Sequence, residues 1–249
     1  SYPLLPSEVL AFSYTLALLA VINIIWGATN AIAQKDLKKM VAYSSISHMG
    51  YVLLGMAAVV SVDPAGNQAG MNGAVMQMFN HGVITAMLFL LVGMIYDRTH
   101  HRWIVFPSDY DKKELAGKIG FGGLSNVMPI YSGFVMLAFF AGLGLPGLSG
   151  FISEAFCFIG GFSVFRLLTV IGTLGILLNA VYFLRAYQRM FWGELEDRNS
   201  KLTDINTIEL ITILPLAFLV LMFGVYPSPL IELIQPAVQN IIDIIQIAI

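Results

Sequence analysis

The sequence has almost no cysteine and little charge. Its 249 residues include one cysteine, and Asp, Glu, Lys and Arg together make up 11% of the chain. One cysteine cannot close a disulfide within the chain, and the sequence has no cysteine set for an iron–sulfur cluster, no metal-ligand spacing and no glycine-rich phosphate loop. The net charge of −2 offers no basic surface to a nucleic acid. These absences argue against a redox or nucleotide-binding domain and against a nucleic-acid partner.

Long apolar runs are present instead. Hydrophobic residues make up 57% of the chain and the mean hydropathy is +0.79, values typical of a polytopic membrane protein. A chain of this length holds about six crossings, so we expect an all-α, polytopic transmembrane bundle of about six helices. The first residues form no basic segment, so we expect no signal peptide, and the chain is expected to begin partway through a larger protein.

The apolar runs fall at about 9–33, 40–62, 70–96, 127–165, 165–191 and 208–226. The fourth run is too long for one straight crossing of about 20 residues, and Pro146 stands near its middle among glycines. Proline removes a backbone donor and clashes with the preceding turn, so we expect a helix broken near this residue. We also expect a short interfacial helix at 109–119, and an amphipathic tail after residue 230 that lies on the membrane or against a partner.

One carboxylate follows the expected break. Glu154 is the acidic residue deep inside this otherwise uncharged run. An ionisable group in hydrocarbon costs several kcal/mol and marks a functional site with a partner. A broken helix that carries a buried acid is the arrangement expected of an ion pathway.

Two neighbouring crossings each carry a polar stripe with a histidine in mid-membrane. The spacing i, i+3, i+4, i+7 places one set on one helix face, and a second set shares a face of the next helix. One interpretation is hydrogen bonding between helices. The other is a hydrated proton relay, because histidine titrates near neutral pH. The stripes comprise Ser44, Ser47, His48 and Tyr51, and then Gln77, Asn80, His81 and Thr85.

The remaining ionisable groups give the orientation. Of the 13 lysines and arginines, all but Arg166 lie in or next to the loops on the side of the 34–39 segment, which we name the X side. The positive-inside rule therefore places the X side in the cytoplasm or its equivalent, with both ends of the chain outside. Arg185 is interpreted as an interfacial anchor, and His100 and His101 as plain surface residues.

Two stretches carry a family resemblance. Residues 34–50, QKDLKKMVAYSSISHMG, resemble a long and specific signature of the antiporter-like subunits of respiratory complex I, which Mrp-type cation/proton antiporters and membrane-bound hydrogenases share. Residues 144–154, GLPGLSGFISE, resemble the broken helix of the same family. Glu154 in that helix is similar to the NuoM type, also named NdhD, whereas other members have lysine there.

The resemblance implies a domain organisation. Residues 1–192 would match the second five-helix antiporter-like repeat, and residues 193–249 the final transmembrane helix with its amphipathic tail. The first repeat would be absent, which implies an exit half-channel without an intake half. The partners implied are the N-terminal half of the same subunit, NuoL-like and NuoN-like membrane-arm subunits, and the lipid bilayer. The location implied is a bacterial inner membrane, with a mitochondrial inner or thylakoid membrane as alternatives.

The resemblance also implies a function and its residues. The chain would be a proton-translocating part of a redox-driven NADH (or ferredoxin):quinone oxidoreductase, with flavin, iron–sulfur clusters and quinone held by other subunits and no cofactor or metal here. Protons would move through buried Lys, His and Glu groups, namely Lys38, His48 and His81, with Glu154 as the gate toward the outside. The alternatives are a subunit of a Mrp-type sodium/proton antiporter or of a membrane-bound hydrogenase, and a structural membrane spacer.

Overall fold

The computed structural model describes residues 4–61, 63–106, 108, 117–118 and 120–247. The described part of the chain is helical, and an isolated β-bridge joins Asp36 and Trp103. The interfacial helix expected at 109–119 falls almost entirely outside the described residues. The elements in chain order are α1 Pro6–Ala33, α2 Leu37–Ala57, η1 Ala58–Val60, α3 Pro64–Thr99, η2 Leu124–Asn126, α4 Pro129–Gly142, α5 Ser149–Val164, α6 Arg166–Phe191, η3 Asp197–Asn199, α7 Thr207–Val225 and α8 Ser228–Gln246.

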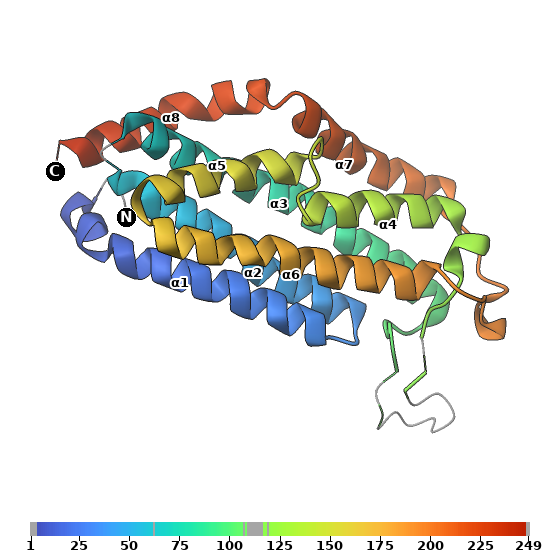
Figure 1. The fold of residues 1–249 in the computed structure, drawn as a ribbon. Coiled ribbons are helices and arrows are strands. Elements are labelled where there is room, and N and C mark those ends of the chain that lie inside the picture. The colour runs from blue at the N-terminus through green and yellow to red at the C-terminus, as the bar shows by residue number, and fades with distance from the viewer. Residues whose placement is uncertain (1–3, 62, 107, 109–116, 119, 248–249) are drawn as a thin grey trace.

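Among the described residues, five helices are long and apolar enough to cross a membrane, namely α1, α2 with η1, α3, α6 and α7. The shorter apolar helices α4 and α5 lie end to end and together form the broken crossing (Figure 1). Gly144 and Gly147 have φ of 76° and 93° in the connection between them. This left-handed region is open to glycine at little cost, so the two glycines and Pro146 end α4 there. The predicted polytopic all-α bundle with one Gly/Pro-broken helix is confirmed.

Loop carboxylates fix where helices begin. Asp36 accepts hydrogen bonds from the backbone nitrogens of Lys38 and Lys39 and so caps α2. Asp204, on the loop before α7, accepts from the backbone nitrogens of Ile130 and Tyr131 at 2.8 and 3.0 Å. These bonds satisfy donors that a helix start leaves free. Asp204 thereby holds the first turn of α4 against a segment distant in sequence.

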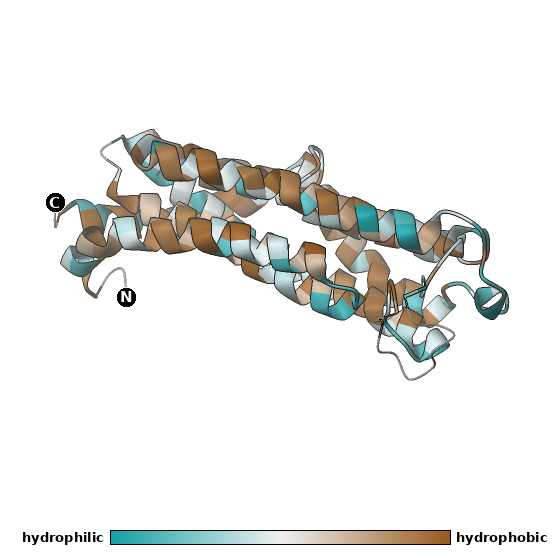
Figure 2. Cartoon of the chain, turned by 60° about the horizontal axis from the view of Figure 1, so that its bottom comes forward, coloured by the Kyte–Doolittle hydropathy of each residue, from teal (hydrophilic) through white to brown (hydrophobic). Residues whose placement is uncertain are grey.

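Small residues let the long helices approach closely. A Cβ atom at Gly27 of α1 would lie 2.6 Å from the backbone nitrogen of Ser47 in α2. On the other side of the bundle, Gly160 of α5 and Gly70 of α3 meet backbone to backbone. Close backbone approach at small residues is the usual way in which membrane helices pack. The outer faces of the bundle are largely apolar, as the brown ribbons of Figure 2 show.

The two ends of the bundle differ. The ends of the described chain lie together at one end, and the loops of the X side gather at the other, where hydrophilic residues concentrate (Figures 1 and 2). Within the X-side end, both oxygens of Glu209 in α7 accept hydrogen bonds from Arg98 of α3 at 2.7 Å. This placement agrees with the predicted even number of crossings.

Helix α8 is amphipathic, as predicted, but its apolar stripe packs on the bundle itself. Glu232 and Asp243 are exposed on its polar side. The buried stripe lies against α1, η1 and the start of α3, a contact that the sequence did not suggest, and the placement of the tail on the membrane surface or on a partner stays a prediction. Apolar area is removed from water most simply by the nearest apolar surface, which here belongs to the same chain. In this contact Val238, Ile242 and Ile245 of α8 pack with Val9, Val59 and Met71 of the bundle.

Candidate functional site

Glu154 lies inside the bundle, in the second turn of α5. Its side chain is 5% exposed and its Oε1 atom lies 3.1 Å from Nδ1 of His48 in α2. Gln77 of α3 donates a longer hydrogen bond of 3.5 Å to the same oxygen. The other oxygen faces the helix break, because a Cβ atom at Gly144 would lie 2.9 Å from Oε2. The carboxyl group is therefore held between α2, α3 and the break.

His81 extends the cluster along α3. Its ring centroid lies 5.3 Å from that of His48, and its Nε2 is 3.1 Å from the hydroxyl of Thr85. His48 is 4% exposed and His81 is partly buried. The predicted residues His48, His81 and Glu154 thus meet in one place, although they come from three helices.

Hydrogen bonds between α3 and α5 set the position of Glu154. The amide of Asn80 donates to the carbonyl of Ser149 at 2.8 Å and to the hydroxyl of Ser153 at 3.2 Å. Ser153 in turn donates a short hydrogen bond to the side-chain oxygen of Gln77. Each bond fixes the first turns of α5 against α3, directly beside the carboxyl group.

This arrangement can hold and move a proton. A carboxylate with an imidazolium and a carboxylic acid with a neutral imidazole differ by the position of one proton across the 3.1 Å contact of His48 and Glu154. In a low-dielectric interior a nearby charge moves this balance strongly, and His81 is close enough to supply one. In the described ranges, no set of three or more His, Cys, Asp and Glu side chains is placed to hold a metal ion.

A second buried network joins α2 to α6. Asn179 donates to the hydroxyl of Tyr51 at 3.2 Å, and its oxygen lies 3.5 Å from the hydroxyl of Ser47. Both Asn179 and Tyr51 are fully buried. The sequence analysis did not identify Asn179 or Ser153. Asn179 could have been found, because it is an amide in the middle of an apolar run and stands three residues before Tyr182, on the same helix face.

Lys38 lies away from this cluster. It stands in the first turn of α2 at the X-side end, and its side chain is exposed. The expectation that Lys38 is a buried group is therefore wrong, and its role in proton transfer stays a prediction. The physical reason is the cap: Asp36 starts α2 at Leu37, so Lys38 falls in the boundary turn, where its ammonium group reaches water.

Both polar stripes face the interior, as predicted. Ser44, Ser47 and Tyr51 are buried on α2, as are Gln77 and Asn80 on α3. Bonds such as those from Asn80 to α5 show that hydrogen bonding between helices is present. That role does not exclude proton transfer, because the hydroxyl and imidazole groups of the same stripes can exchange protons.

His101 differs from the surface residue that the sequence suggested. Its ring stacks on Phe121 with centroids 4.8 Å apart and lies 5.1 Å from the ring of Phe106. Burial, and then the cation of Arg198, lower the pKa of His101 to about 4. His100 is exposed, as predicted.

Comparison with known proteins agrees with the resemblance read from the sequence. Residues 2–179 match the model of the family described as NADH:quinone oxidoreductase/Mrp antiporter, transmembrane. The chain is 39% identical over 241 residues to NADH-quinone oxidoreductase subunit M of Rickettsia conorii, covering 96% of this chain and 45% of that protein. The chain therefore spans about half the length of the curated relatives that it matches.

Solved structures show the same fold. A chain of respiratory complex I from Thermus thermophilus aligns with a TM-score of 0.83 at 28% identity, over 96% of this chain and 46% of that one. The Mrp complex from a Dietzia species aligns with a TM-score of 0.75 at 18% identity, over 93% of this chain and 48% of that one. The second likeness concerns the fold alone.

Proposed function

Because the chain belongs to the NADH:quinone oxidoreductase/Mrp antiporter transmembrane family, we propose that it is the C-terminal half of a NuoM-type subunit that translocates protons. The assembly would be a redox-driven NADH (or ferredoxin):quinone oxidoreductase, and the location a bacterial inner membrane. Other membrane-arm subunits of the NuoL-like and NuoN-like types, and the N-terminal half of the same subunit, would cover its apolar faces. Flavin, iron–sulfur clusters and quinone would belong to other subunits.

One observation supports this proposal most directly. The carboxyl group of Glu154 lies at a helix break and contacts the buried imidazole of His48, with His81 beside it. Buried ionisable groups in membrane helices are costly and mark proton relays. A structural role alone needs no pair of titratable groups here, since apolar side chains of similar volume would pack as well.

The proposed mechanism follows from charge. A proton that arrives on His81 or His48 places a cation beside Glu154 and lowers the free-energy cost of its ionised form. Glu154 then releases its proton toward the outside. A tenfold change in a proton-binding equilibrium corresponds to about 1.4 kcal/mol, which is comparable to moving one charge through about 60 mV. A distant redox event can therefore be coupled to proton release from Glu154 without large motions of the helices.

The test is Glu154→Gln in the intact assembly, reconstituted in liposomes, with donor oxidation and lumen acidification followed together. We expect proton release to fall about tenfold or more, because the amide has nearly the same shape and cannot release a proton. The matched control is Glu232→Gln on α8, whose carboxyl group is exposed and which should pump at the parent rate. In the same assay His81→Ala should reduce the number of protons moved per donor oxidised.

Other outcomes point to other functions. Full pumping by Glu154→Gln would make the broken helix structural and support the spacer alternative. Sodium-dependent pH changes in vesicles that lack both donor and quinone would support the antiporter alternative. The likeness to the Mrp complex makes this second measurement necessary, since the fold is common to both classes.

A further inference from the structure

Buried polar groups continue from the site toward the X side. They lie between α2 and α6. Asn179 bonds to Tyr51, whose ring lies edge-on to that of His48 at 5.9 Å. One turn closer to the X side, Tyr182 is 2% exposed. These groups are separate from the Gln77, Asn80 and Ser153 set beside Glu154.

Tyr182 has an unusual hydroxyl group. The hydroxyl is buried and makes no hydrogen bond to any residue that the structure describes, although the Ser44 side chain is nearby. Leaving a buried hydroxyl unpaired is unfavourable, because it loses its bonds to water and gains none in the protein. A phenylalanine would pack the same space without that cost, so a purely structural role does not explain the oxygen. An ordered water molecule would satisfy it.

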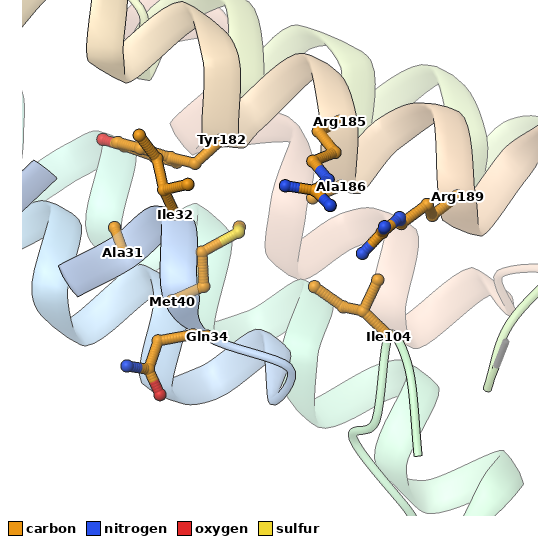
Figure 3. Close-up of a pocket in the computed structure, with 9 residues that line it drawn as sticks. All are labelled: Ala31, Ile32, Gln34, Met40, Ile104, Tyr182, Arg185, Ala186 and Arg189. Carbon is orange, nitrogen blue, oxygen red and sulfur yellow. The ribbon is translucent and has the colours of Figure 1, made fainter. Parts of the chain in front are cut away.

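A small cavity lies between Tyr182 and the X-side loops. It measures about 20 Å³, which is room for about one water molecule. Tyr182 borders its inner part, and Arg185, Arg189 and Gln34 line it toward the X-side loops. Figure 3 shows both arginine side chains extending from α6 toward this space, and the Tyr182 hydroxyl pointing to the other side of the ring, away from them. In the described part of the chain neither arginine has a carboxylate partner.

On the basis of the proposed function, we propose that protons enter from the X side through this cavity. They pass along Tyr182, Ser47 and Tyr51 to His48 and Glu154, with water molecules between groups that do not touch, and Asn179 orients the Tyr51 hydroxyl by its hydrogen bond. This half of the subunit would then have its own intake route. The resemblance alone implied an exit half-channel that depends on the absent half for intake. Arg185 and Arg189 would keep the mouth hydrated, because guanidinium groups stay charged and retain water.

The test compares two tyrosines of the same helix in the intact assembly. Tyr182→Phe removes only the unpaired hydroxyl, so folding should be unaffected. Tyr187→Phe is the matched control, because its hydroxyl pairs with Ser132 at 2.9 Å, away from the route. We expect proton uptake from the X side, measured with an impermeant pH dye, to fall about tenfold in Tyr182→Phe and to stay at the parent rate in Tyr187→Phe.

A second measurement reports water access without relying on pumping. In Tyr182→Cys, a small charged thiol reagent added on the X side should modify the new thiol, and the same reagent added outside should not. Cys157 is fully buried and serves as the unreactive internal control. Absence of modification from the X side would overturn the proposed route.

The outcomes separate this inference from the proposed function. If Glu154→Gln stops proton release while Tyr182→Phe takes up protons like the parent, intake runs elsewhere and the function stands. If Glu154→Gln also pumps fully, the proposed function itself fails, and the intake route fails with it.

Discussion

His48 and Glu154 each need the other inside the membrane. Their contact of 3.1 Å joins α2 to α5, and both side chains are 5% exposed. Removal of one partner leaves a polar group that neither water nor lipid can satisfy. Replacement of both by apolar residues of similar volume is often neutral or stabilising. The pair is therefore expected to matter for function more than for stability.

We predict that His48→Leu destabilises the assembly by about 1–3 kcal/mol, because Glu154 loses its buried partner. The double variant His48→Leu/Glu154→Met should regain most of this loss while remaining unable to pump. Thermal unfolding of the purified assembly measures both. A double variant no more stable than His48→Leu would show that the two side chains are not energetically coupled.

The break between α4 and α5 is the element that gives Glu154 its surroundings. Gly144 and Gly147 both have positive φ, but they differ in what lies beside them. A Cβ atom at Gly144 would crowd the Glu154 carboxyl group, whereas one at Gly147 would meet nothing within 4 Å. Substitution of either glycine should strain the backbone, but only substitution of Gly144 should also disturb the carboxyl group of Glu154.

We predict that Gly144→Ala and Gly147→Ala each lower stability by about 1–2 kcal/mol, because alanine is strained in the left-handed region. Only Gly144→Ala should also lower proton pumping per donor oxidised, since its methyl group displaces the carboxyl group. Thermal unfolding and the liposome assay distinguish the two effects. Equal pumping by both variants would mean that the position of Glu154 beside the break is unimportant.

The molecule as a whole is tied together at its X-side end. Arg98 joins α3 to α7 through Glu209, and Arg102 binds Asp36 at 3.0 Å between the first two X-side loops. His101 adds an aromatic stack to the same end. These contacts lie in or beside the loops, so their strength depends on pH and salt.

We predict that acid weakens this end of the molecule through His101. Its pKa is about 4 in the folded chain against an ordinary value near 6.5, so the unfolded chain binds more protons between these values. Stability is therefore complete above about pH 6.5 and is lost as the pH falls toward about 4, by about 1 kcal/mol for this partly exposed group.

Thermal unfolding at about pH 7.5 and about pH 5.5 measures the effect. His101→Gln should reduce the difference between the two midpoints, and His100→Gln, which changes an exposed neighbour, should leave it unchanged. A difference that survives unaltered in His101→Gln would assign the acid sensitivity to other groups.

The sequence by itself determined the class of protein, the number and order of the crossings, the place of the break and three members of the site. Each depends on local chemistry: apolar length, glycine and proline, and helical spacing. A polar residue in a long apolar run must face the interior, so Glu154, His48 and His81 could be identified without coordinates. The boundary position of Lys38 follows from the same local rules once Asp36 is recognised as a cap.

Only the tertiary structure decided which of these residues meet. The contact between His48 and Glu154 joins residues 106 apart in sequence, and no spacing rule relates positions on different helices. The role of Asn179, the unpaired hydroxyl of Tyr182 and the cavity beneath Arg185 depend on how α6 rotates against α2. The packing of α8 on its own bundle could not be predicted from the sequence either. Amphipathicity identifies which face of a helix is buried, but it does not identify the surface against which that face packs.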